Sequence, residues 1–204
     1  MSVNNKNVYV GAPDQKVTGA ILSGPETDVI PATIDDFDDV AQLDDSGYVT
    51  EDGVTITPEE STESIKDWSL GNIRTILTEF SGSVAWTHLE LSLAALKTYF
   101  GDDNVEVVEA TASHGTQTRA ALGAGERPIK SWVFRIKDGV RRLVVFVPHG
   151  QVTERGEIPL VASGAVTLPV TLSTYPDAAG QNIYIYTDDG VVSASSGGGS
   201  GSDD

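Results

Sequence analysis

Alternating apolar and polar residues between positions 48 and 89 predict two β-hairpins in series. The predicted turns are Glu51-Asp52-Gly53 and Ser81-Gly82-Ser83, and an Asp-Gly pair between β-forming residues is a strong local turn signal. The strands that they would join are residues 48–49 with 54–56, and residues 73–80 with 84–89. The alternation is mixed rather than strict, so we expect both faces of these strands to be covered.

The spacing of apolar residues then changes to that of a helix. The residues at this spacing are Leu89, Leu93, Leu96 and Phe100. Gly101 follows directly, where a glycine commonly ends a helix. Two N-terminal caps are compatible with the sequence: Thr87 with Glu90 as a capping box, or Ser92.

The second half of the chain contains further strand patterns. The clearest is a hairpin over residues 130–147 with its turn at Lys137-Asp138-Gly139, ended by Pro148 and Gly150. Other predicted strands are residues 17–22, broken at Ser23-Gly24-Pro25-Glu26, residues 105–110, two strands within 152–172, and residues 182–186. Residues 111–128 lack periodicity, which predicts a surface or inter-subunit loop.

These patterns predict a mainly β fold, a β-sandwich or partly open barrel with one short packed α-helix. The expected core anchors are Trp86, Leu93, Leu96, Phe100, Trp132 and Phe134. We expect an N-terminal arm at residues 1–16, a single β domain at 17–190 and a disordered Gly/Ser/Asp tail at 191–204.

Composition restricts the classes of function. The 204 residues contain no cysteine, which excludes disulfides and thiolate metal sites, and no stretch is apolar and long enough to span a bilayer. The N-terminus lacks the pattern of a signal peptide, so we expect a soluble protein made in the cytoplasm. A formal net charge of -17 opposes specific binding of nucleic acid, because affinity for phosphate comes largely from lysine and arginine.

The charges are unevenly distributed. No basic residue lies between Lys16 and Lys66, where acidic residues accumulate, whereas basic residues gather between Arg127 and Arg142. Two hypotheses are compatible with this pattern. The two regions are separate solvated surfaces, or they meet across a subunit boundary, where opposed charges would fix orientation.

Catalytic and metal sites are not expected. His88, His114 and His149 lie far apart and form none of the common zinc motifs, and His88 in a strand pattern indicates a structural role. The aspartate runs at residues 35–39 and 44–45 lack the ligand spacing of a calcium loop. We therefore expect no enzyme activity and no cofactor.

The order of several short patterns carries a family resemblance. These are Val17–Ile21, Ile30–Thr33, Gly47-Tyr48-Val49, the turn at 51–53, Trp68, Ile73-Arg74, Thr78-Glu79, a strand ending at Glu90, and Tyr99-Phe100-Gly101. Over roughly residues 15–150, this order resembles the major tail (tail tube) proteins of long, non-contractile-tailed bacteriophages.

The resemblance implies a structural virion protein that forms hexameric rings, which stack into the tube through which the genome passes into the host. The implied partners are other copies of the chain, the tape measure protein, the tail tip or initiator complex and the tail terminator, with DNA passing without specific binding. The implied location is the phage tail, with assembly in the host cytoplasm and no membrane.

We expect the inter-subunit elements to be the connection from residue 57 to 68 and the loop from 111 to 128. The inter-subunit candidates are Thr57, Glu59, Glu60, Ile65, Trp68, Thr111, His114, Arg119 and Arg127. The candidates for the lumen are Thr55, Thr57 and Glu59. For Trp68, burial in the core and contact with a neighbouring subunit remain open.

Two other functions are compatible with the sequence. A β-sandwich carbohydrate-binding or adhesion module would share the acidic, cysteine-free and strand-rich composition, but it would be a monomer. A different virion component, such as a decoration or connector protein, would self-assemble without unlimited stacking.

Overall fold

The structure is a computed structural model that describes residues 9–13, 19–37 and 43–192. The expectations for residues 1–8 and 193–204 lie outside the described residues. The elements in chain order are β1 (Ile21–Pro25), the 3-10 helix η2 (Ile34–Phe37), β2 (Asp44–Asp45), β3 (Val49–Lys66), β4 (Asn72–His88), α1 (Leu93–Phe100), the 3-10 helix η3 (Asp102–Asn104), β5 (Val105–Val108), β6 (Gln117–Ala120), β7 (Lys130–Asp138), β8 (Arg141–Arg155), β9 (Leu168–Tyr175) and β10 (Tyr184–Asp188).

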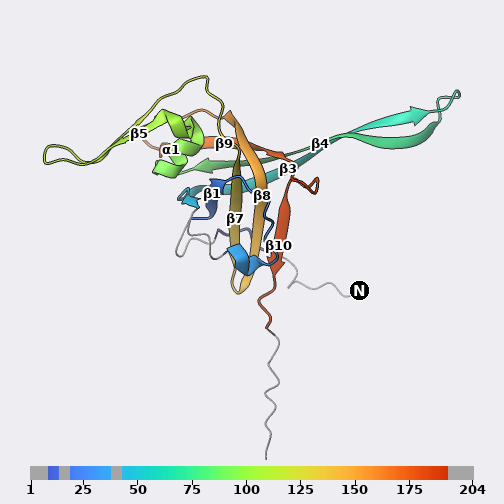
Figure 1. Cartoon of the computed structure of the whole chain (residues 1–204), viewed down its shortest axis with the longest axis horizontal. Coiled ribbons are helices and arrows are strands. Elements are labelled where there is room, and N and C mark those ends of the chain that lie inside the picture. Colours follow the sequence, from blue (N-terminus) through green and yellow to red (C-terminus); the bar gives the residue numbers. More distant parts are fainter. Residues whose placement is uncertain (1–8, 14–18, 38–42, 193–204) are drawn as a thin grey trace, which may run out of the picture.

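One antiparallel sheet, in the order β2-β1-β7-β8-β9-β4-β3, makes up the body. Strand β8 connects its two halves, because residues 142–146 pair with β10 and residues 149–155 pair with β9. The sheet thus folds over itself without closing, while β5 and β6 form a separate pair. The prediction of a mainly β, partly open fold with one short helix is confirmed (Figure 1).

The core lies between the two halves of the folded sheet. Alternate residues of β4 and β9 point inward, so Trp86 and Val170 are buried while their chain neighbours are half-exposed. The Trp86 ring lies 5.3 Å from that of Trp132 and 5.4 Å from that of Phe134. Large aromatic side chains contribute strongly to burial, so this cluster is a major source of stability.

Helix α1 begins after Ser92, whose side chain accepts a hydrogen bond from the Ala95 amide, and this decides between the two predicted caps. Gly101 ends the helix with a φ of 98°, a conformation that favours glycine. The buried helix residues are Ala95, Thr98 and Tyr99, whereas Leu96 and Phe100 are partly buried. The expectation that Leu93 is a core anchor is wrong, because this first-turn residue is 43% exposed.

Residues 49–88 form one long hairpin instead of the two predicted in series (Figure 1). Its turn lies between β3 and β4, where the Asp67 amide donates to the carbonyl of Gly71. The Asp52-Gly53 pair lies in an irregularity of β3, and the positive φ of Gly53 serves a bulge there rather than a turn. Gly82 pairs with Pro58 and Thr174 inside β4, and Thr174 of β9 lies too close for a larger side chain at this position.

Three other boundaries differ from the prediction. Strand β1 continues through Pro25, which is its last residue. Strand β8 continues past Pro148, which lies at a register shift against β7 where a proline costs no ladder hydrogen bond. The predicted loop at 111–128 contains strand β6.

Candidate assembly surfaces

The outer part of the β3–β4 hairpin, residues 58–80, projects away from the body, and we call it the arm (Figure 1). All its residues are exposed except the half-buried Ile76. The predicted connection from Thr57 to Trp68 is therefore the outer half of a strand and the start of a turn. At the tip, Trp68 is 102% exposed and Leu70 has a φ of 64°.

The arm carries several large apolar side chains that are exposed in the described chain. They are Ile65, Trp68, Leu70, Ile73, Leu77 and Phe80. Isolated two-stranded hairpins are at best marginally stable in water, and exposed apolar patches commonly mark interaction sites. Both considerations favour a partner protein surface along the arm.

Strands β5 and β6 with their loop, residues 105–120, form a second projection that we call the finger. In Figure 1 the finger and the arm extend toward opposite sides of the molecule. Arg119 and Glu106 form an exposed ion pair of 2.8 Å across the finger. The loop closes where the Thr111 amide donates to the His114 carbonyl.

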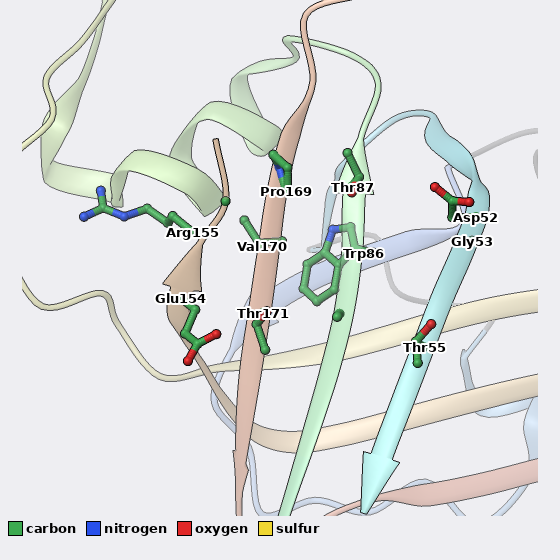
Figure 2. Close-up of a pocket in the computed structure, with 12 residues that line it drawn as sticks. Asp52, Gly53, Thr55, Trp86, Thr87, Glu154, Arg155, Pro169, Val170 and Thr171 are labelled. Atoms are coloured by element: carbon green, nitrogen blue, oxygen red, sulfur yellow. The ribbon is translucent and has the colours of Figure 1, made fainter. Parts of the chain in front are cut away.

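Strands β8, β9, β4 and β3 present a broad face opposite the core. Directly paired residues form rows across this face, such as Thr57-Ser83-Ser173-Gln151 and Thr55-Ala85-Thr171-Glu154. The second row lines a shallow depression of about 300 Å³ (Figure 2). The two rows contain no lysine or arginine.

The structure distributes the candidate residues over three surfaces. Thr57 lies where the arm begins, and the arm itself bears Glu59, Glu60, Ile65 and Trp68. The finger bears Thr111, His114 and Arg119. Arg127 lies apart from both, at the end of β8, where its side chain donates to the carbonyl of Val152.

The sequence profile of the phage tail tube protein family matches residues 1–197. The chain belongs to this family. It is therefore a structural protein of the virion tail. Family membership favours this function over that of a carbohydrate-binding or adhesion module. A solved structure of the tube-terminating cap of the anti-feeding prophage is similar, with a TM-score of 0.47 and 10% identity over 92% of this chain and 100% of that chain. No curated protein sequence matches the chain.

In this tail tube protein, part of the basic segment is neutralised within the chain. Arg142 contacts Asp35 and lies 3.1 Å from Asp188, and Lys130 lies 2.7 Å from Asp102. Neither sequence hypothesis anticipated these internal pairs. The two Arg142 contacts hold η2, the start of β8 and the end of β10 together, and the Lys130–Asp102 pair joins the start of β7 to η3.

The histidines of the tail tube protein have separate surroundings. His88 is fully buried and accepts a hydrogen bond of 2.9 Å from Trp86 Nε1. Burial lowers the pKa of His88 to about 4, against the opposing effect of the Ser46 backbone. His149 lies 2.9 Å from Asp28. Within residues 9–13, 19–37 and 43–192, no group of three or more potential metal ligands occurs, and no helix is apolar and long enough to cross a membrane.

Proposed function

We propose that this tail tube protein assembles into hexameric rings that stack into the tail tube, the conduit for the genome into the host. The observation that carries the proposal is the projecting arm with its exposed apolar side chains, on a chain of the tail tube family. Among the described residues, the arm contributes no side chain to either core cluster.

The positions of the arm and the finger support head-to-tail association. The arm and the finger extend to opposite sides of the molecule (Figure 1). A contact that uses the arm of one copy and another surface of its neighbour would therefore join two different surfaces. Such heterologous contacts close into rings when the rotation divides the circle, and otherwise produce open filaments. A tube needs a ring-closing contact between subunits of one ring and a filament-forming contact between successive rings.

We place the broad face of strands β8, β9, β4 and β3 toward the channel. The four strands alternate in direction, so β3 of one copy runs antiparallel to β8 of a copy beside it. Sheets lying side by side around a ring would then keep their alternation of strand direction and surround a wide channel. In this arrangement Thr55 and Thr57 line the lumen and Glu59 lies at its end, so these three residues offer DNA no cation to bind.

The remaining partners in the proposal come from the family. Other tail components would meet this chain at the two ends of the tube: the tail tip or initiator complex and the tail terminator. The tape measure protein would occupy the lumen during assembly in the host cytoplasm, before DNA passes. A decoration or connector protein is the alternative, and it would form closed rings without stacking.

Negative-stain electron microscopy at rising protein concentration, with solution mass measured alongside, tests this function. We expect hollow tubes of uniform width or six-membered rings. A chain in which an Asn-Gly turn replaces residues 61–79 joins the directly paired Glu60 and Phe80, and should fold normally but remain monomeric. A wild-type chain that is monomeric at every concentration, or a shortened chain that still forms tubes, would contradict the proposal.

A further inference from the structure

Two arginines meet at the outer end of β8. Arg155, the last residue of the strand, lies over the Tyr99 ring at 5.9 Å, and its Nη1 atom is buried without a hydrogen-bond partner. The Arg127 side chain donates to the carbonyl oxygens of Val152 and Thr153. Arg127 therefore occupies backbone carbonyls that a neighbouring strand could otherwise use. The groups at this edge are the guanidinium groups of the two arginines.

The positive charge of these two arginines is not balanced locally. Burial and repulsion from Arg155 lower the pKa of Arg127. In the part of the chain that the structure describes, neither arginine forms an ion pair with a carboxylate, although the chain has 30 acidic and 13 basic residues. A buried, unpartnered guanidinium nitrogen is unfavourable unless an acceptor reaches it.

At the opposite edge of the same four strands lie two carboxylates that form no ion pair within the described residues. One row of directly paired residues crosses the four strands: Val54 of β3, Trp86 of β4, Val170 of β9 and Arg155 of β8. Val54 and Arg155 are the two ends of this row. Glu51 and Asp52, both exposed, precede Val54 at the free edge of β3. Figure 2 shows Arg155 and Asp52 on opposite sides of the row.

Within one chain these charges cannot meet. Three strand spacings of about 4.8 Å separate the edges, roughly 14 Å in all. Two copies placed side by side would bring the acidic edge of one against the arginine edge of the other.

We propose that the Arg127–Arg155 pair of one subunit binds the Glu51–Asp52 segment of its neighbour in the ring. The inference rests on the proposed ring and identifies the contact that fixes its register. Because Arg127 occupies backbone acceptors of the β8 edge, charge rather than a continuous backbone ladder determines which edge docks there.

Charge reversal tests the contact. Arg155→Glu and Asp52→Arg should each raise the concentration needed for assembly by at least about tenfold, as close charge pairs in interfaces do. The double variant carries a reversed pair at every interface and should recover most of the loss. Asp189→Arg, the same change at an exposed residue beyond β10, is the matched control and should assemble normally. Equal unfolding midpoints for all variants would exclude misfolding.

Cross-linking gives a second readout, because the chain has no cysteine of its own. An Asp52→Cys, Arg155→Cys chain is treated with a bismaleimide that is shorter than the width of the four strands. We expect a ladder of linked subunits that ends at the size of the closed ring, and no ladder from an Asp189→Cys, Arg155→Cys control.

The outcomes separate this contact from the proposed function. Wild-type tubes with neither an effect of charge reversal nor a ladder would overturn the contact and leave the tube in place. A ladder without wild-type tubes would support the contact and overturn stacking. The absence of both would overturn both.

Discussion

The three tryptophans allow one chemical change to be tested in three environments. Trp68 is 102% exposed in the isolated chain, whereas Trp86 is 3% and Trp132 is 1% exposed. Replacement of each by alanine removes the same atoms. Its effect on folding and on assembly should therefore depend on what covers the ring.

The magnitudes follow from burial. Truncation of a core tryptophan costs about 3–5 kcal/mol of the free energy of unfolding. Trp86→Ala also removes the donor to His88, and Trp132→Ala the donor to the Gly150 carbonyl, which adds about 1–3 kcal/mol each. Since domains are stable by only about 5–15 kcal/mol, both variants should be largely unfolded or close to it.

Trp68→Ala should change the stability of the monomer by no more than about 0.5 kcal/mol, as is usual for surface substitutions. If the arm docks on a neighbour, a tryptophan at its tip is expected to contribute about 2–4 kcal/mol to the contact. Assembly should then weaken by about 30-fold to about 1,000-fold.

Urea unfolding at low concentration measures the first quantity, and light scattering against concentration measures the second. Val140→Ala, at an exposed apolar residue of the β7–β8 turn, is the control and should change neither. A Trp68→Ala chain that is destabilised as a monomer by more than about 1 kcal/mol, or that assembles as readily as wild type, would refute this reasoning.

Three further predictions concern stability. Because burial lowers the pKa of His88 to about 4 from an ordinary 6.5, the neutral form stabilises the fold, by about 3 kcal/mol above pH 6.5. This contribution should be lost as pH falls from 6.5 toward 4, and a His88→Gln chain should show a shallower dependence of the free energy of unfolding on pH. Gly82→Ala should lower the free energy of unfolding by about 1–3 kcal/mol, because its Cβ would lie 2.7 Å from Thr174 Oγ1. Ser92→Ala should cost about 1 kcal/mol by removing the N-cap of α1, measured by thermal unfolding.

Each of these predictions has a matched comparison. An unchanged pH dependence in His88→Gln between pH 5 and 7 would contradict a buried neutral histidine. Gly115→Ala, where no atom lies within 4 Å, controls for the added methyl group. Ser69→Ala, in the exposed turn of the arm, controls for loss of a hydroxyl and should leave the unfolding temperature unchanged.

Periodicity along the chain was sufficient for much of the fold. The alternation in residues 130–147 predicted the β7–β8 hairpin, and the helical spacing after Leu89 with Gly101 predicted α1. The ordered pattern of short motifs indicated the phage tail tube family, to which the chain belongs. The hairpin and the helix depend on residues close in sequence, so local propensity and side-chain direction are enough to determine them.

The arm could not be predicted in the same way. Asp52-Gly53 and Ser81-Gly82-Ser83 are good local turn signals, yet both lie inside strands. A glycine permits a turn, a bulge or a close approach, and the partner strand selects among them. At Gly82 the partner is Thr174 of β9, which is 92 residues away in sequence and whose hydroxyl donates to the Gly82 carbonyl.

The arrangement of charge was likewise decided by tertiary structure. The sequence determined that acidic residues precede Val54 and that arginines occur at positions 127 and 155. Only the order of strands β8, β9, β4 and β3 places these groups at opposite edges of one sheet. Pairing between residues far apart in sequence is governed by the packing of a shared core, and no pattern within a single strand encodes it.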